Sequence, residues 1–253
     1  MNTGEKRDLT GKVAVVTGAS RGIGRAIALR LGEMGATVIL NYCSHDEEAQ
    51  SALQAVEKSG ARAQLVKADI SRSAEASRLI DTVLAEHKRI DILINNAGVQ
   101  RAVMSYKMSD ADWHEVMDIN VSSVFYLSRA VLPAMIEARS GHIINIGSAS
   151  GFTAHKGAAS YCASKYALIG LTKVLALEVA DKGVQVNGVA PGITDTDMIK
   201  SLSEAARNQL LSSIPMKRMA QPEEVADMVA FIITEASYST GNFFHISGGF
   251  IMG

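Results

Sequence analysis

The chain alternates short runs of β-branched residues with longer amphipathic segments, and this alternation limits its possible folds more than any other feature. Strand-like runs lie at 12–17, 37–41, 63–68, 91–96, 142–147, 184–190 and 242–247. Helical patterns lie near 22–34, 46–59, 73–88, 110–138, 158–181 and 222–234. Strands separated by helices form right-handed crossovers and a parallel sheet that is covered on both faces. The pattern therefore predicts an α/β fold with a doubly wound, seven-stranded parallel sheet.

No stretch rich in proline, serine and glycine interrupts this alternation, so we expect one domain over residues 1–253. The irregular stretch is 192–220, where a Pro-Gly turn leads into a polar, methionine-containing segment that suits short helices. Ligands of open α/β sheets bind beyond the carboxyl ends of the strands. We therefore predict a substrate lid at 192–220, with an ordinary surface excursion as the alternative. We also expect Ser109 to cap a helix and Pro222 to occupy a first helical position.

The charge balance excludes several classes of partner. The chain has 25 basic and 26 acidic residues, a formal net charge of -1, and no concentrated run of lysine and arginine. This gives no electrostatic footprint for nucleic acid or an anionic membrane. The polar N-terminus lacks a signal-peptide core, and no apolar run approaches the ~20 residues that span a bilayer. We expect a soluble, cytoplasmic protein.

The two cysteines, Cys43 and Cys162, resemble neither a disulfide framework nor a metal-ligand cluster. Two isolated thiols in a chain of this kind are typical of reduced, small apolar side chains. We therefore predict no disulfide and no metal site.

The first strand-like run leads directly into TGASRGIG, in which Gly18, Gly22 and Gly24 open a helix. Glycines let the backbone turn tightly and approach a pyrophosphate, whose charge is met by free amides and the helix dipole. Such a turn is weak evidence alone, but this one has the required strand-turn-helix setting. The run NNAG at 95–98 ends the fourth strand, which lies beside the first in a doubly wound order. The two segments are predicted to share one dinucleotide crevice.

The choice between NAD and NADP depends on the group that meets the ribose 2′ position. A carboxylate favours the free diol and repels a phosphate, whereas arginine favours the phosphate. The second strand ends NYCS without an acid, and Arg21 lies inside the glycine-rich turn. NADP(H) is therefore the predicted cofactor. Asp46 lies close in sequence, and Arg21 is also compatible with a solvated turn residue, so the alternative stays open.

Tyr161 and Lys165, in SYCASKYALIG, lie four residues apart, which places both side chains on one helix face. A phenol has an unperturbed pKa of about 10. A neighbouring cation stabilises the phenolate and lowers that pKa, so Lys165 is expected to make Tyr161 a usable acid and base. The pair alone is common on surface helices. Ser148, however, ends the fifth strand at the same sheet edge, where a hydroxyl can stabilise charge that develops on a carbonyl oxygen.

The wide spacing of the first two glycines, together with NNAG and YCASK, resembles the short-chain dehydrogenase/reductase family and its Rossmann-type fold. The resemblance spans nearly the whole chain. It implies that Tyr161 protonates a carbonyl oxygen as hydride arrives from the nicotinamide, and that Ser148 polarises and orients that carbonyl. It also implies that Lys165 lowers the Tyr161 pKa and holds the nicotinamide ribose, while Asn120, in DINVSS, anchors a water that feeds protons through Lys165.

The same resemblance implies a set of cofactor contacts. Residues after the third strand would hold the adenine, NNAG the adenosine side, and PGITDT at 191–196 the nicotinamide carboxamide. The implied cofactor-binding residues are Gly18, Ser20, Arg21, Gly22, Ile23, Gly24, Asn41, Asp69, Ile70, Asn96, Ala97, Gly98, Tyr161, Lys165, Pro191, Gly192, Ile193, Thr194 and Thr196.

Within the family, runs such as INIGSASG and VNGVAPGITDTDM look most like those of 3-oxoacyl-[acyl-carrier-protein] reductases. In those enzymes basic residues near the cleft meet the acidic carrier protein, and the matching positions here are Arg139 and Lys182. The dipole at a helix C-terminus also favours cations, which is the alternative explanation. Two loops that border the substrate depart from the reductase pattern: VQRAV after NNAG, which keeps only Arg101, and HKGAAS before Tyr161.

These departures keep other functions open. A specialised 3-oxo substrate, carrier-bound or free, fits the pattern, and so does a secondary alcohol, a sugar or a steroid. A catalytically silent dinucleotide sensor is a further alternative. His155 is a candidate substrate contact, with a plain exposed loop histidine as the alternative. Family members commonly form tetramers through their two longest helices, so the segments near 110–138 and 158–181, with the C-terminal strand, predict a homotetramer.

Overall fold

One seven-stranded parallel sheet forms the centre of the molecule. The structure is a computed structural model that describes residues 8–196 and 204–252. Its strand order is β3-β2-β1-β4-β5-β6-β7, and every neighbouring pair is parallel, which confirms the predicted doubly wound sheet. The strands are β1 (Val13–Val16), β2 (Thr37–Tyr42), β3 (Ala63–Lys67), β4 (Ile92–Asn95), β5 (Gly141–Ile146), β6 (Val184–Pro191) and β7 (Phe243–Ile246).

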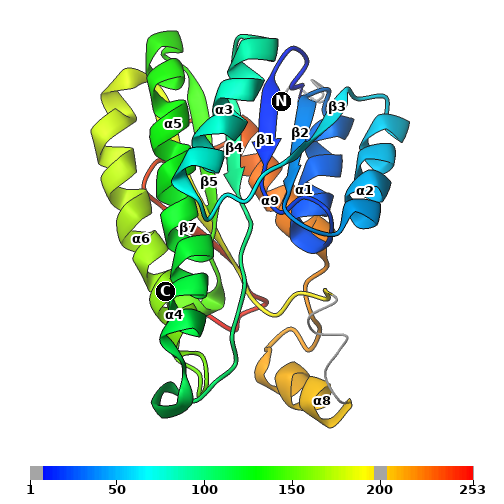
Figure 1. Ribbon diagram of the computed structural model, residues 1–253. Coiled ribbons are helices and arrows are strands. Elements are labelled where there is room, and N and C mark those ends of the chain that lie inside the picture. Colours follow the sequence, from blue (N-terminus) through cyan, green and yellow to red (C-terminus); the bar gives the residue numbers. More distant parts are fainter. Residues whose placement is uncertain (1–7, 197–203, 253) are drawn as a thin grey trace.

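Helices cover both faces of this sheet, as the alternation predicts. The α-helices are α1 (Gly22–Glu33), α2 (Asp46–Lys58), α3 (Ser73–His87), α4 (Asp110–Met117), α5 (Ser123–Ala138), α6 (Ala159–Val179), α8 (Glu204–Ser213) and α9 (Pro222–Thr234). Residues of α1, α2 and α9 pack in one buried cluster, and residues of α3, α5 and α6 in another (Figure 1). Each cluster includes side chains from the strands, so the sheet separates two apolar layers.

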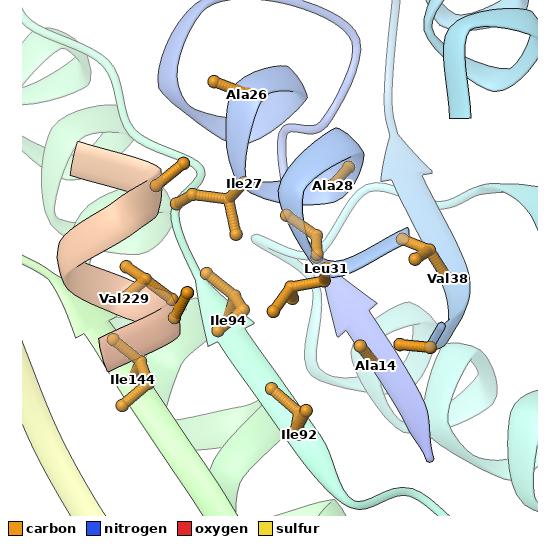
Figure 2. Packing of buried hydrophobic residues seen from close by; sticks show 14 of the residues in the cluster. Ala14, Ala26, Ile27, Ala28, Leu31, Val38, Ile92, Ile94, Ile144 and Val229 are labelled. Carbon is orange, nitrogen blue, oxygen red and sulfur yellow. The ribbon is translucent and has the colours of Figure 1, made fainter. Parts of the chain in front are cut away.

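The packing of α1 on the sheet determines where the glycine turn lies. Ile27 and Leu31 are fully buried, and they belong to one cluster with Ala14 of β1 and Val229 of α9 (Figure 2). Burying an aliphatic side chain of this size stabilises a fold by about 1.5–3 kcal/mol. Since α1 begins immediately after the turn, these contacts hold its N-terminus at the carboxyl end of β1.

The helix expected over 110–138 is divided into two. A π-helical turn, η2 (Asp118–Ser122), joins α4 to α5 and contains Asn120. Such turns inside α-helices occur frequently at functional sites. The Ser109 hydroxyl caps α4 by accepting the Asp112 amide at 3.1 Å, and Pro222 begins α9, as predicted.

The stretch Asp110–Ala138 is long and apolar enough to cross a membrane, with a mean hydropathy of 1.3 over its most apolar window. From the sequence we expected no apolar run of this length, and the structure differs from that expectation. In the fold, 44% of that window is buried inside the protein. Leu127, Val131 and Met135 lie in the apolar layer that α5 shares with α3 and α6. Packing in the core therefore accounts for the apolar character of this helix.

The predicted lid, 192–220, leaves the carboxyl end of β6 and returns to α9. The Asp195 amide donates to the Ala220 carbonyl at 2.9 Å, and the Ala220 amide donates to the Ile193 carbonyl at 3.0 Å. These bonds hold the two ends of the segment together. Within it, α8 stands beyond the lower end of the sheet in Figure 1. Residues 197–203 lie outside the described residues, and the role of a lid stays a prediction.

Candidate active site

The turn between β1 and α1 needs glycine for two separate reasons. Gly18 has a φ of +60°, in the left-handed region that residues with a side chain rarely adopt. A Cβ built on Gly24 would overlap the Gly18 carbonyl oxygen and Asn96 Nδ2. The first amides of α1, which follow directly, have no partner within the helix and favour an anion. This turn fits the diphosphate of a dinucleotide.

Hydrogen bonds tie the NNAG run to the glycine turn. The Thr17 hydroxyl accepts the backbone amides of Asn96 at 2.9 Å and Ala97 at 3.1 Å. Asn96 Nδ2 donates to the carbonyls of Thr17 at 2.9 Å and Gly18 at 3.2 Å. The two segments meet at one sheet edge, as predicted. We had not singled out Thr17, although a hydroxyl between a buried strand and a glycine turn is a readable signal.

The segment predicted to hold the nicotinamide reaches the same turn. A Cβ on Gly22 would lie 3.6 Å from Thr196 Cγ2. Thr194 is buried, and its hydroxyl donates to the Gly192 carbonyl at 3.3 Å. Asp195 Oδ1 is a buried atom without a hydrogen-bond partner in the described part of the chain. Residues from β1 and from the segment after β6 therefore frame one end of the sheet.

Two residues predicted to contact the cofactor are already engaged within the protein. Asn41 is buried, and its Nδ2 donates to two backbone carbonyls at the end of β3, each at 3.2 Å. The Asp69 carboxylate accepts the Ser71 hydroxyl at 2.6 Å and pairs with Arg72 at 3.2 Å. The contacts of Asn41 hold β2 to β3 and give no support to cofactor binding by its side chain. Adenine binding by Asp69 and its buried neighbour Ile70 stays a prediction.

The acid nearest the end of β2 is also paired. Lys67 Nζ lies 2.8 and 3.0 Å from the two carboxylate oxygens of Asp46. Hydrogen bonds from Lys67 and from the Tyr42 hydroxyl lower the pKa of Asp46. Arg21, just before α1, is exposed and has no ion-pair partner within residues 8–196 and 204–252. The acid near the end of β2 is therefore neutralised, whereas the cation just before α1 is exposed.

Tyr161 and Lys165 lie together near the start of α6, as predicted. Lys165 Nζ is 5.6 Å from the centre of the Tyr161 ring. Lys165 is buried and donates to the Ile146 carbonyl at 2.9 Å, at the end of β5. The Ser148 hydroxyl accepts the Ser150 amide at 3.1 Å and lies near enough to the Tyr161 phenol to lower its pKa. A phenol, an ammonium and a hydroxyl thus meet at the carboxyl end of β5.

Burial governs the protonation of the two titratable groups. It raises the pKa of Tyr161, and the hydrogen bond with Ser148 acts in the opposite direction. It also lowers the pKa of Lys165 from 10.5 to about 8. We expected Lys165 to lower the pKa of Tyr161, but Lys165 is not among the groups that shift it. The reason is that the ammonium is directed at the Ile146 carbonyl and burial dominates at the phenol.

Asn120 is buried between the NNAG loop and α6. Its Oδ1 accepts the Val99 amide at 2.8 Å, and its Nδ2 donates to the Val99 carbonyl at 2.9 Å and the Ser164 hydroxyl at 3.0 Å. A Cβ on Gly98 would lie 3.3 Å from Asn120 Oδ1 and 3.7 Å from Lys165 Nζ. The structure therefore brings Asn120 close to the predicted catalytic lysine, and its side chain holds the intervening loop.

The two residues predicted to dock a carrier protein lie at the opposite edge of the sheet. Arg139 precedes β5 and Lys182 precedes β6, so both stand at the amino ends of strands, whereas Tyr161 stands at the carboxyl ends. The 21 residues of α6, at about 1.5 Å each, separate the two edges by about 30 Å. Arg139 donates to the Asp181 carbonyl at 3.1 Å, and Lys182 to the Glu178 carbonyl at 2.7 Å. The prediction that they border the cleft is wrong for a single chain.

Aromatic side chains that we had not singled out gather beyond the end of β5. Phe152 meets His245 edge-on, with 4.4 Å between ring centres, and lies 6.0 Å from Phe243. His155, an exposed loop residue, stacks on Phe250 at 6.3 Å. We call these five residues the aromatic wall. Its members come from three separate segments, which explains why a linear pattern did not reveal it.

The two loops that depart from the reductase pattern are neighbours. The Val103 amide donates to the Gly157 carbonyl at 3.0 Å, which joins the loop after NNAG to the loop before Tyr161. Arg101 forms a two-pronged ion pair with Glu115 of α4, at 2.8 and 2.6 Å. Arg101 therefore anchors the first loop to α4.

A turn that admits a diphosphate, beside a buried lysine and a phenol at the carboxyl edge of a parallel sheet, defines an oxidoreductase that depends on a dinucleotide. The family model described as short chain dehydrogenase matches residues 12–207. The chain belongs to the short-chain dehydrogenase family.

Relatives and solved structures cover almost the whole chain. The 3-oxoacyl-[acyl-carrier-protein] reductases of Synechocystis sp. and Escherichia coli K12 are each 42% identical to it, over 96% of this chain and 98% of their own length. A candidate short-chain alcohol dehydrogenase from Sinorhizobium meliloti 1021 has a TM-score of 0.92 and 31% identity, over 97% of this chain and 98% of its own. A candidate 2-deoxy-D-gluconate 3-dehydrogenase from Agrobacterium tumefaciens, with bound NADP, has a TM-score of 0.90 and 33% identity, over 98% and 99%.

Proposed function

We propose that this protein is an NADPH-dependent reductase that converts a 3-oxoacyl thioester to the 3-hydroxyacyl product. The observation that carries the proposal is the meeting of Tyr161, Lys165 and Ser148 at the sheet edge where the glycine turn opens α1. The two reductases at 42% identity support this substrate class. The structural relative with bound NADP, together with the exposed Arg21, supports NADP(H).

In this reaction three side chains control the proton. The nicotinamide supplies the hydride when it is bound. The Ser148 hydroxyl donates to the substrate carbonyl oxygen and holds it beside Tyr161. Because burial raises its pKa, Tyr161 is protonated at neutral pH and can give its proton to that oxygen as negative charge develops. Ser148, which lowers the pKa of the phenol, then stabilises the phenolate that remains.

Tyr161 must regain its proton after each turnover. Asn120 lies close to Lys165 across Gly98, so it is the residue that we assign to a proton path. Its side chain is occupied by Val99 and Ser164. The irregular backbone of the η2 turn is therefore the part of this region that we propose holds a water.

The chain is proposed to act as a homotetramer in the cytoplasm. Large apolar side chains are exposed on α5 and α6, which supports their burial against a second copy: Phe125 at 41%, Tyr166 at 50%, Val174 at 53% and Leu177 at 84%. Since Arg139 and Lys182 lie far from Tyr161 of their own chain, carrier docking through them would serve the site of another copy. Light scattering after size-exclusion chromatography tests this, and a stable monomer would contradict it.

A second candidate is a dehydrogenase of sugars or secondary alcohols with the same chemistry. The candidate 2-deoxy-D-gluconate 3-dehydrogenase at 33% identity and the two departing loops favour it. A silent dinucleotide sensor is disfavoured because Tyr161, Lys165 and Ser148 meet as turnover requires.

Turnover with matched substrates tests the proposal. NADPH oxidation is measured with acetoacetyl thioesters of coenzyme A and of an acyl carrier protein, and NADP reduction with 2-deoxy-D-gluconate. We expect the thioesters to be reduced, with the carrier-bound form preferred. Turnover of the sugar acid alone would support the second candidate. Tight NADPH binding without turnover of any carbonyl would overturn both in favour of a sensor.

A further inference from the structure

Three side chains at the carboxyl end of β2 and β3 form a cluster, which we call the clamp: Tyr42, Asp46 and Lys67. Lys67 Nζ lies 2.8 and 3.0 Å from the Asp46 carboxylate oxygens. The same ammonium lies 5.6 Å from the centre of the Tyr42 ring. Burial and an interaction with the Asp46 carboxylate both raise the pKa of the Tyr42 phenol. Each member therefore interacts with the other two.

The clamp lies beside the glycine turn. The Ala19 amide, inside that turn, donates to the Asn41 carbonyl at 3.0 Å, one residue before Tyr42. The Ala68 amide, one residue after Lys67, donates to the Tyr42 carbonyl at 3.0 Å. In doubly wound folds the adenosine ribose of a dinucleotide lies near the end of the second strand. The clamp is therefore placed to act on that ribose.

By its sequence spacing, Asp46 would be the acid that selects NAD, but its contacts in the structure neutralise that acid. It follows Gly24 by 22 residues. An acid about 20 residues beyond the glycines holds the ribose 2′-hydroxyl in NAD enzymes, and a free carboxylate there repels a 2′-phosphate. In this structure, however, the charge of Asp46 is balanced by Lys67, and Tyr42 occupies the same carboxylate.

Among the acids at the start of α2, Asp46 is the one that Lys67 pairs with. Glu47 and Glu48 follow it in the first turn of α2, at steps of about 100° around the helix axis, so they point to other faces. Lys67 bonds Asp46, and neither glutamate is an ion-pair partner of Lys67 within the residues that the structure describes. Pairing lowers the pKa of Asp46 and raises that of Lys67, so both stay charged at neutral pH.

We propose that Lys67 determines cofactor specificity by masking Asp46, so that the ribose 2′ site accepts a phosphate. The inference rests on the proposed use of a dinucleotide and assigns a selectivity role to a residue outside the glycine turn. Both side chains are more than half exposed, at 55% and 64%. Exposed ion pairs contribute little to stability. Removing Lys67 should therefore change the choice of cofactor and leave the fold intact.

The test measures the dissociation constants of NADPH and NADH by calorimetry on the full chain, with no carbonyl substrate present. We expect the wild type to prefer NADPH and Lys67→Met to lower that preference about tenfold. Asp46→Asn alone should change it little, because the acid is already masked. Adding Asp46→Asn to Lys67→Met should restore the preference, and Lys67→Arg should retain it. Lys58→Met, at the other end of α2, removes the same charge and should have no effect.

Three results would overturn the masking role. Equal weakening of both cofactors by Lys67→Met would make Lys67 merely structural. A double variant that stays weak for NADPH would mean that Lys67 contacts the phosphate itself. Tighter binding of NADH than NADPH by the wild type would mean that Asp46 is not masked. Since no substrate is present, failure to reduce a 3-oxoacyl thioester leaves this outcome unaffected, whereas a chain that binds neither dinucleotide would overturn both proposals.

Discussion

The glycine-turn side of the site and its substrate side are held together by different contacts. On the first side, Thr17 and Asn96 join two buried strand ends through hydrogen bonds between side chain and backbone, and a Cβ on Gly24 has no room. On the substrate side, the aromatic wall rests on side-chain contacts of loop residues with β7 and with one another, and His155 is exposed. Close backbone approach tolerates few residue types, whereas loop side chains are readily exchanged. The chain can therefore keep its redox chemistry while its substrate differs from that of its relatives.

The largest expected effect comes from Tyr161→Phe, which removes the phenolic hydroxyl that we propose as the proton donor. We expect the turnover number to fall about 10³-fold, because the proton donor is lost. NADPH affinity should change little, since the ring and its packing remain. Turnover and calorimetry on the same preparation check this, and a variant with more than a tenth of wild-type turnover would contradict the role of Tyr161.

Lys165→Met should change how stability depends on pH. Lys165 has a pKa of 10.5 unfolded and about 8 in the fold. Between these values the unfolded chain binds a proton that the folded chain lacks, so wild-type stability rises with pH by up to about 3 kcal/mol in total. Below pH 8 the charge is present in both states, and burial penalises the fold.

Methionine has no such proton, so the variant should lose this rise. We measure the free energy of unfolding of both proteins in urea from pH 8 to pH 10.5. The wild-type value minus the variant value should increase over this range. Groups that titrate in both proteins cancel in the difference. Parallel pH profiles for the two proteins would show that burial does not lower the pKa of Lys165.

Gly24→Ala should disrupt the closely packed glycine turn. The added methyl group overlaps the Gly18 carbonyl and Asn96 Nδ2, which should cost about 2 kcal/mol of stability and weaken NADPH binding. Gly170→Ala in α6 is the matched control, because nothing lies within 4 Å of the place that its methyl group would take. That change should stabilise the fold by about 0.5–1 kcal/mol. Thermal unfolding of both variants tests the contrast, and equal shifts would refute it.

Phe152→Ala tests whether the aromatic wall contributes to substrate binding. Loss of its edge-on contact with His245 should loosen the aromatic wall and raise the KM for the thioester about tenfold, with NADPH affinity unchanged. Tyr238→Ala, at a fully exposed aromatic, should leave both values at wild type. A variant in which NADPH affinity falls and KM does not would place the wall on the cofactor side.

The features that were predictable from the sequence depend on residues only a few positions apart. Strand and helix periodicities located every strand and all the long helices, because burial of one face imposes a repeat on neighbouring residues. The glycine turn was readable because backbone conformation restricts residue type at each position. Tyr161 and Lys165 were readable because a spacing of four determines a shared helix face.

The features that were missed depend on residues far apart in the chain. Arg139 and Lys182 were expected close to the cleft, yet α6 carries Lys182 to the other edge of the sheet. Asn41 was expected to contact the cofactor; its amide nitrogen is hydrogen-bonded to the end of β3, and the contact stays a prediction. The division of the long helix at Asn120 was likewise not visible in its pattern.

From its sequence alone, this protein's parallel sheet, its dinucleotide turn and its Tyr-Lys helix face were determined, since each follows from residues a few positions apart. Only the tertiary structure decided that Lys67 neutralises Asp46, that burial sets the pKa of Lys165 near 8, and that aromatic residues from separate segments meet beyond the end of β5. Charge balance and burial depend on which distant segments become neighbours, and that arrangement exists only once the sheet has formed.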